Sequence, residues 1–210
     1  MTKVIVCFGD SNTWGANPDG SGRFAPDVRW TGVLQNELGQ GYKVIEEGLN
    51  GRTTNIEDTI EEDRNGRRHL PSLLESHRPF DLITIMLGTN DLKWRNNRAA
   101  ADIAQSAAKL ADLARRSLCG PDGSAPKVLL MAPPATVEAG HPLDALFTGS
   151  VEKSRQFPEQ YAYWAEAIGA GFLDAGAVIV SSSIDGIHFD PDQHLALGKA
   201  VAAKVRELLD

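Results

Sequence analysis

The six residues LITIML, residues 82–87, form a run near the middle of the chain that is apolar except for Thr84. A strand with one face in solvent alternates apolar and polar residues, whereas a continuous run of this length is typical of a strand buried on both faces. Such strands occur mostly in parallel sheets that helices cover on either side. The run therefore predicts an α/β protein in which strands and helices alternate along the chain.

The segments around this run show that alternation. Four further short runs have the composition of strands: residues 3–8, 42–46, 128–131 and 171–174. Between and around them lie segments with helical spacing of apolar residues or with helix-start and helix-stop residues: 28–38, 71–77, 99–118, 154–168 and 191–209. In the second of these, Pro71 is expected in the first helical turn, and the charged segment 55–68 before it is expected to be a surface loop.

Strands separated by helices define βαβ units, because parallel neighbours need a crossover connection. We predict one domain over residues 1–210 with a flavodoxin-like three-layer fold: a five-stranded parallel sheet, order 2-1-3-4-5, with helices on both faces. Sites in such sheets form at the carboxyl ends of strands, near the point where the strand order reverses. Residues that follow the first three strands should therefore lie at one edge of the sheet.

Charge and composition disfavour several classes of function. Of the 210 residues, 42% are hydrophobic and 23% are charged, as in globular domains. The net charge of −7 argues against nucleic acid or an anionic membrane as the partner, because both attract basic surfaces. Two cysteines, Cys7 and Cys119, do not suggest a disulfide framework. With no apolar run of membrane-spanning length and no signal peptide, we expect a cytoplasmic protein.

Polar residues follow three predicted strands and precede the last predicted helix. Ser11 lies in GDS after the first strand, Gly51 in LNGR after the second, and Asn90 in GTND after the third. The stretch DGIH near the C-terminus holds Asp185 and His188. Each stretch alone is a common turn or helix cap. Together they supply what nucleophilic catalysis needs, since a serine requires a base and an attacked carbonyl requires donors for its oxyanion.

Histidine is the usual base for a serine nucleophile, and a carboxylate usually fixes its tautomer. Asp185 and His188 are three residues apart, which places both side chains on one side of a turn, so that the aspartate can orient the ring toward Ser11. The oxyanion donors would be the N–H groups of Ser11 and Gly51 and the side-chain amide of Asn90. Alternatives lie close by in the sequence: His194 as the base, and Asp190 or Asp192 as the acid.

Other charged residues are assigned structural roles. The acidic run 57–63 is expected to be a solvated face, and Asp10 to cap a helix that begins at the Ser11 turn. No metal site is predicted, because the remaining histidines have no cysteine or carboxylate at metal-binding spacing: His69, His77, His141 and His194.

Four blocks resemble, in the same order, those of the SGNH or GDSL hydrolases: FGDSNTWG, EEGLNGRTT, MLGTND and DGIHF. The stretches DVRWTGVLQNELG and APKVLLMAPP resemble the bacterial arylesterase and acyltransferase branch of this family. The resemblance implies a flavodoxin-like fold and a serine esterase with no metal or organic cofactor. It implies Ser11 as the nucleophile, His188 as the base and Asp185 as its acid, with Ser11, Gly51 and Asn90 forming the oxyanion hole.

The resemblance also implies a substrate class, namely small short-chain acyl esters such as aryl or alkyl acetates and acetylated carbohydrates, with acyl transfer as a related activity. Asn12, which stands where the branch carries leucine, and Trp14 are expected to contact the substrate. The expected partner is a small-molecule ester, and a homo-oligomer is left open. Two alternatives remain: a thioesterase or lysophospholipase of the same family, and a non-catalytic flavodoxin-like module that binds phosphate.

Overall fold

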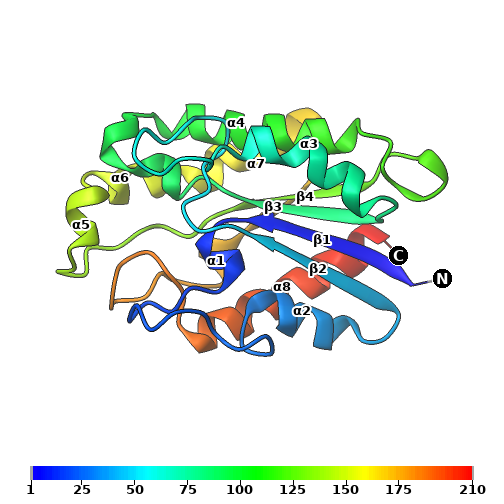
Figure 1. Ribbon diagram of the computed structural model, residues 1–210, viewed down its shortest axis with the longest axis horizontal. Coiled ribbons are helices and arrows are strands. Elements are labelled where there is room, and N and C mark those ends of the chain that lie inside the picture. Colours follow the sequence, from blue (N-terminus) through cyan, green and yellow to red (C-terminus); the bar gives the residue numbers. More distant parts are fainter. Residues whose placement is uncertain (1, 210) are drawn as a thin grey trace.

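A computed structural model describes residues 2–209, and a five-stranded parallel sheet lies at its centre (Figure 1). The strand order is β2-β1-β3-β4-β5, which confirms the predicted order. The strands have these bounds: β1 (Lys3–Gly9), β2 (Tyr42–Gly48), β3 (Leu82–Met86), β4 (Lys127–Ala132) and β5 (Gly171–Asp174).

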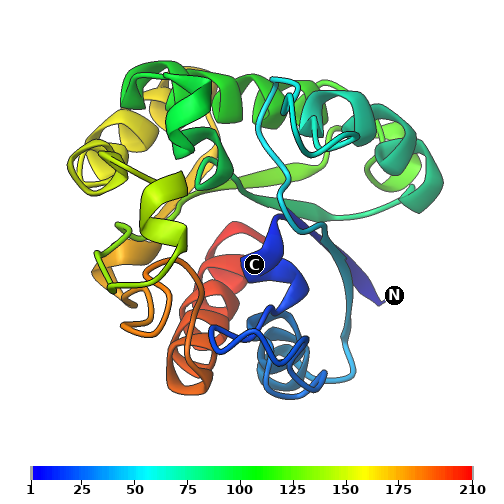
Figure 2. The same ribbon diagram turned by 60° about the vertical axis from the view of Figure 1, so that its left-hand side comes forward.

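Long helices cover both faces of the sheet, as Figure 2 shows. One layer consists of α3 (Gly66–His77), α4 (Ala100–Arg115) and α7 (Phe157–Ile168), and the other of α2 (Trp30–Leu38) and α8 (Pro191–Leu209). The short helices are α1 (Ser11–Trp14), α5 (Leu143–Leu146) and α6 (Ser150–Ser154). Single 3₁₀ turns are η1 (Asn90–Leu92), η2 (Trp94–Asn96), η3 (Pro121–Gly123) and η4 (Ala175–Ala177).

The central strands bury side chains on both faces, which explains their largely apolar sequences. In β1, Val6 and Phe8 pack under α3 and α4, whereas Ile5 and Cys7 pack toward α2 and α8. All five residues of β3 are buried. Each face of the sheet thus contributes to its own apolar cluster, and burial of this surface is the main force that holds the three layers together.

Two helices begin at other residues than predicted. The helix expected at residues 71–77 begins at Gly66, because the Asn65 side chain caps it by accepting the Arg67 N–H at 3.0 Å. Pro71 therefore lies inside α3 rather than in its first turn, and its exposed position leaves the unpaired Arg67 carbonyl near solvent.

The helix expected at residues 154–168 corresponds to α7, which begins at Phe157, and Ser154 is instead the last residue of α6. Pro158 lies in the first turn of α7 and has no N–H to donate to the carbonyl of Ser154. A continuous helix through this point would lose that hydrogen bond, so the chain turns after Ser154 and α7 starts at Phe157.

The strand register brings the ends of three strands together. Gly9 at the end of β1 pairs with Gly48 of β2 and with Met86 of β3. In Figure 1 the segments that follow these strands meet near α1, on the left, while both chain ends lie on the right. The loops that carry the predicted site residues therefore converge at one edge of the sheet.

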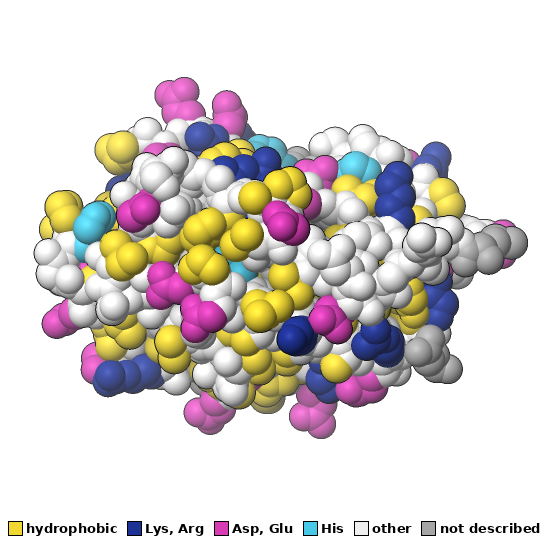
Figure 3. Space-filling model, turned by 90° about the horizontal axis from the view of Figure 1, so that it is seen from below, with side chains coloured by type: hydrophobic (Ala, Val, Ile, Leu, Met, Phe, Trp, Pro, Cys, Tyr) yellow, Lys and Arg dark blue, Asp and Glu magenta, His cyan; other side chains and the backbone are white. Residues whose placement is uncertain are grey.

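No helix within residues 2–209 is long and apolar enough to cross a bilayer. Seen from below, the layer of α2 and α8 shows apolar side chains distributed among acidic and basic ones (Figure 3). Several large apolar side chains between η4 and the start of α8 are exposed: Val178, Val180, Ile184 and Leu195. The cytoplasmic location and the homo-oligomer stay predictions.

Candidate active site

Ser11 is the first residue of α1, in the tight turn that follows β1. Asp10 caps this short helix, because its carboxylate accepts the N–H of Asn12 at 3.0 Å. Glycine at position 48 lets α1 approach β2 closely, since a Cβ there would lie 2.1 Å from the backbone nitrogen of Trp14. The turn holds Ser11 at the wall of a cavity at the carboxyl edge of the sheet.

The imidazole ring of His188 lies between Ser11 and Asp185. Its Nε2 is 3.0 Å from Ser11 Oγ, and its Nδ1 is 2.5 Å from Asp185 Oδ2. The other oxygen of Asp185 accepts the backbone N–H groups of Ile187 and His188, both at 2.9 Å. The structure thus brings together three predicted residues from opposite ends of the chain, within hydrogen-bond distance of one another.

Asp185 is buried, and burial raises the pKa of its carboxyl group. The hydrogen bond from the His188 ring, the charge of that ring and the two backbone N–H groups outweigh burial, so the pKa lies below its ordinary value. At neutral pH the group is therefore a carboxylate, which accepts a hydrogen bond from Nδ1–H of His188. This assigns the free lone pair of the neutral ring to Nε2, the nitrogen that faces Ser11.

The loop that carries Asp185 and His188 is fixed to its surroundings by backbone hydrogen bonds. Gly186 donates to the Ser182 carbonyl at 2.9 Å and accepts from the Val137 N–H at 3.0 Å. Its φ of 79° favours glycine, and a Cβ there would lie 2.1 Å from the Val137 carbonyl oxygen. Asn12 adds a side-chain bond, donating from Nδ2 to the Ile187 carbonyl at 3.2 Å. This bond joins the Ser11 turn to the His188 loop.

The alternative base and acids form hydrogen bonds elsewhere. His194 is fully buried, and its Nδ1 accepts the backbone N–H of Trp30 at 3.2 Å. Burial, and then the charges of His188 and Arg29, lower the pKa of His194 to about 4. Asp190 accepts the Ser182 hydroxyl at 3.0 Å, and Asp192 accepts the Gln193 amide at 2.8 Å.

Three predicted oxyanion donors line the same cavity. The backbone N–H groups of Ser11 and Gly51 donate to no acceptor among residues 2–209, so both are free for a ligand. Gly51 has a φ of 78°, a conformation that side chains disfavour. The Asn90 amide donates to the Arg52 carbonyl at 3.2 Å and has a longer second contact, 3.5 Å, with Asp10 Oδ2.

The cavity at Ser11 has a volume of about 200 Å³. Apolar side chains form part of its lining: Ala16, Leu143, Leu146, Phe147 and Ile187. Asn50, Glu61 and Lys93 also line it, and our sequence analysis identified none of these three as site residues. Within residues 2–209, no group of three His, Cys, Asp or Glu side chains is arranged to hold a metal ion.

The expectation that residues 57–63 form a solvated face is wrong for two members of the run. Glu61 lines the cavity, and the Asp58 side chain is fully buried. Both carboxylates pair with Lys93 and Arg95, which lie just beyond Asn90 in the sequence. These two basic residues account for the inward position of the carboxylates, because a buried charge needs a partner of opposite charge.

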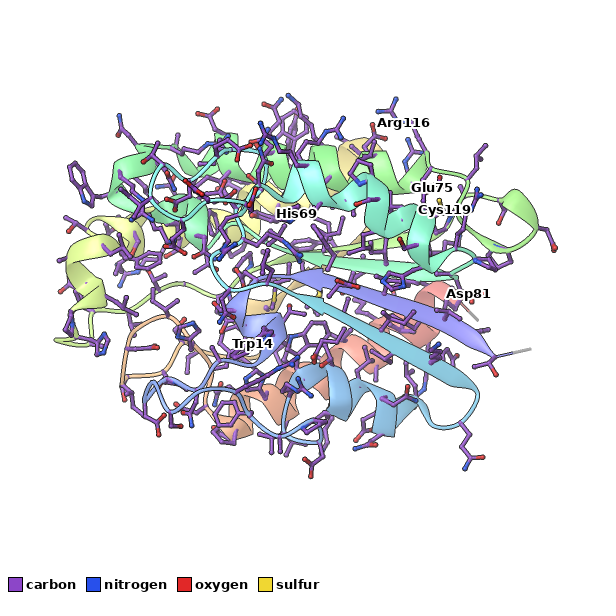
Figure 4. All side chains as sticks on the ribbon, in the orientation of Figure 1. Trp14, His69, Glu75, Asp81, Arg116 and Cys119 are labelled. Carbon is purple, nitrogen blue, oxygen red and sulfur yellow. The ribbon has the colours of Figure 1, made fainter. Side chains whose placement is uncertain are left out.

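Asn12 and Trp14 are not among the described residues that line this cavity. Asn12 is 2% exposed and engaged with Ile187. Trp14 lies on the side of the sheet that α2 covers (Figure 4), and the Arg23 guanidinium stacks 4.8 Å from its ring. Substrate contact by these two residues stays a prediction.

A parallel sheet with a serine, a histidine and a buried carboxylate at its carboxyl edge has the architecture of an α/β serine hydrolase. The model of the GDSL-like lipase/acylhydrolase family matches residues 7–196. The chain belongs to this family, which confirms the resemblance seen in its sequence blocks, and it is a carboxylic ester hydrolase.

Several solved structures are similar over their whole length. The native M. smegmatis aryl esterase is 45% identical, with 99% of this chain and 100% of that chain covered and a TM-score of 0.94. Est24, a carbohydrate acetylesterase from Sinorhizobium meliloti, is 40% identical, with the same coverage and TM-score. A putative arylesterase from Agrobacterium tumefaciens is 38% identical at the same coverage, with a TM-score of 0.90. A comparison with curated protein sequences found no match.

Proposed function

We propose that the chain is a serine esterase that hydrolyses small short-chain acyl esters through an acyl-enzyme on Ser11. One observation carries this proposal: Ser11 Oγ lies 3.0 Å from Nε2 of His188, whose Nδ1 is bonded to the buried carboxylate of Asp185. A serine hydroxyl is a weak nucleophile unless a base within hydrogen-bond distance takes its proton, and this arrangement supplies that base.

In the first half of the reaction, Ser11 Oγ attacks the ester carbonyl carbon and its proton passes to Nε2 of His188. The tetrahedral intermediate then collapses, the bond to the alcohol oxygen breaks, and His188 returns the proton to that oxygen. An acyl-enzyme and a free alcohol remain. In the second half, water attacks the acyl-enzyme and gives a proton to His188, which protonates Ser11 Oγ as the carboxylic acid leaves. An alcohol in place of water gives acyl transfer.

The negative charge that develops on the carbonyl oxygen needs donors already in position. The free N–H groups of Ser11 and Gly51 and the amide of Asn90 serve this purpose in our proposal. Loss of one such donor typically lowers the rate by about 10²- to 10³-fold. Asp185 stabilises the imidazolium that forms at His188 in each proton transfer.

The size of the cavity supports short acyl groups. A volume of about 200 Å³ is below the range of about 300–1,000 Å³ that is usual for sites of drug-sized ligands. Similar proteins are an aryl esterase and a carbohydrate acetylesterase, so we propose aryl acetates and acetylated carbohydrates as substrates. Neither observation favours the thioesterase, the lysophospholipase or the binding module.

Initial rates on p-nitrophenyl esters from acetyl to decanoyl test this proposal. We expect the highest kcat/KM for acetyl, a steep fall with chain length, and a loss of at least about 10³-fold in Ser11→Ala. Ser72→Ala is the matched control, because that serine is exposed on α3 and does not line the cavity. Preference for decanoyl would indicate the lysophospholipase alternative, and equal rates in wild type and Ser11→Ala would contradict the esterase.

A further inference from the structure

Glu61 lines the active-site cavity, and only one of its carboxylate oxygens is engaged. Oε1 accepts from Lys93 Nζ at 2.5 Å and from Arg95 Nη2 at 3.1 Å. The same two cations bind Asp58, with Lys93 Nζ at 3.3 Å and Arg95 Nη2 at 2.6 Å from Oδ2. Two carboxylates and two cations thus form one balanced cluster, of which Glu61 and Lys93 line the cavity.

The second oxygen, Oε2, has no hydrogen-bond or ion-pair partner among residues 2–209. It lies beside the predicted oxyanion donor, since a Cβ at Gly51 would be 2.3 Å from it. Arg64 is the other charged side chain beside Gly51; its Nη1 donates to the carbonyls of Glu62 and Asp63, and its buried Nε has no hydrogen-bond partner among residues 2–209. A free carboxylate oxygen therefore lies beside Gly51 in the lining of the cavity.

Lys93 also lines the cavity, but its positive charge is paired with two carboxylates. Its side chain is 3% exposed, and its ammonium group is held between Glu61 and Asp58, whereas the Glu61 side chain is 37% exposed. A substrate that reaches this part of the lining meets Oε2, which can only accept hydrogen bonds. It binds a hydroxyl or an ammonium group favourably and repels a carboxylate.

We propose that Glu61 is a specificity-determining residue whose Oε2 accepts a hydrogen bond from a substrate hydroxyl. Esters of polyols are then preferred over esters of plain alcohols, and esters that carry a carboxylate are rejected. This inference rests on the proposed esterase function of the same cavity and adds to it the residue that selects the substrate. A hydrogen bond to a charged acceptor changes kcat/KM by about tenfold or more.

A purely structural role for Glu61 predicts something different. The loop is held mainly by Asp58, which accepts the N–H groups of Ile60 and Glu61 at 2.9 and 3.0 Å in addition to the two cations. Glu61→Gln keeps a neutral oxygen for Lys93 and removes the charge that faces the cavity. A structural role would change all substrates alike, whereas a role in selection changes the ratio between substrates.

The test compares kcat/KM for glyceryl monoacetate and ethyl acetate in wild type, Glu61→Gln and the control Glu62→Gln. Glu62 is the neighbouring exposed glutamate, so its variant makes the same charge change outside the cavity. We expect wild type to prefer the glyceryl ester about tenfold, Glu61→Gln to lose most of this preference, and Glu62→Gln to keep it. Similarly, kcat/KM should be lower for p-nitrophenyl hemisuccinate than for p-nitrophenyl butyrate, and this difference should be smaller in Glu61→Gln.

If Glu61→Gln leaves both ratios of kcat/KM unchanged, this inference is overturned. The proposed esterase function still stands in that case, provided that hydrolysis of p-nitrophenyl acetate depends on Ser11. Absence of Ser11-dependent turnover on every ester would instead overturn the proposed function. If Glu61→Gln does not fold, the wild-type protein decides, because a glyceryl-to-ethyl ratio of one or less contradicts a hydroxyl acceptor in the cavity.

Discussion

The Asp185 carboxylate does two things in the structure. One oxygen accepts two backbone N–H groups and shapes the turn, and the other binds Nδ1 of His188. The first task needs only an acceptor, whereas the second needs a negative charge that fixes the ring tautomer. The two tasks can be separated by a substitution that keeps the shape of the side chain.

Asp185→Asn should lower kcat on p-nitrophenyl acetate by about 10⁴-fold with little change in KM, because the amide no longer holds a proton donor at Nδ1 and the free lone pair of the ring turns away from Ser11. Circular dichroism checks that the fold is kept. Asp190→Asn is the matched control, since Asp190 binds Ser182 rather than His188. An equal loss in both variants would show that the tautomer is not the cause.

Residue types at strand ends made much of the site predictable from sequence. Ser11, Gly51 and Asn90 each follow a strand, and a parallel sheet must bring such positions to one edge. Glu61 was not predicted, because an acidic run is usually solvated and nothing in the local sequence shows that Lys93 lies across from it. Pairing between side chains distant in sequence is decided by tertiary structure.

At the scale of elements, His194 connects α8 to α2. The Trp30 N–H that it accepts is one of the first amides of α2, which have no partner within their own helix. The ring also packs edge-on against Phe24 and Phe189, at centroid distances of 5.4 and 5.6 Å. In these surroundings the charged form is unfavourable, and the pKa of His194 falls to about 4 from its usual 6.5.

This lowered pKa makes stability depend on pH in a defined direction. Between pH 6.5 and about 4 the unfolded chain binds a proton at His194 and the folded chain does not, so stability is complete above pH 6.5 and decreases as the pH falls. The full loss is roughly 3 kcal/mol. The buried Asp10 acts oppositely, because burial raises its pKa to about 6 and folding favours its protonated form as the pH falls.

Urea unfolding of wild type and His194→Asn from pH 7 to pH 4 isolates this contribution, because asparagine can still accept the Trp30 N–H but does not titrate. The difference between their free energies of unfolding should move by roughly 3 kcal/mol in favour of the variant as the pH falls. His141→Asn, at a half-buried loop position, is the control and should show no such trend. A pH-independent difference for His194→Asn would contradict a buried neutral histidine.

Most elements were predictable because their apolar periodicity reflects burial, as in β3 and α8. The starts of α3 and α7 were not, because Pro71 was expected in the first turn of its helix and Pro158 was assigned no role. Pro71 marks no boundary, since Asn65 caps the helix earlier, and Pro158 divides what looks like one periodic segment. More than one residue near each of these helix starts can begin the helix. The hydrogen bonds that form in the folded chain determine which one does.

At the scale of the whole molecule, the site depends on the sheet order. The first strand lies between the second and the third, so the loops after all three meet (Figure 1), and the loop between β5 and α8 brings His188 beside them. Alternating strands and helices made this order predictable. The apolar wall from α5 and Phe147 was not, because a short helix in a long loop has no periodic signal.

The central claim is that this arrangement makes Ser11 a nucleophile activated by His188. Phenylmethylsulfonyl fluoride labelling followed by intact-mass measurement and peptide mapping tests it most directly, in wild type, Ser11→Ala and His188→Ala. We predict one adduct on the peptide that contains Ser11, none in Ser11→Ala, and labelling at least about 10²-fold slower in His188→Ala. An adduct on a different serine, or labelling of Ser11 that is equally fast without His188, would contradict the account.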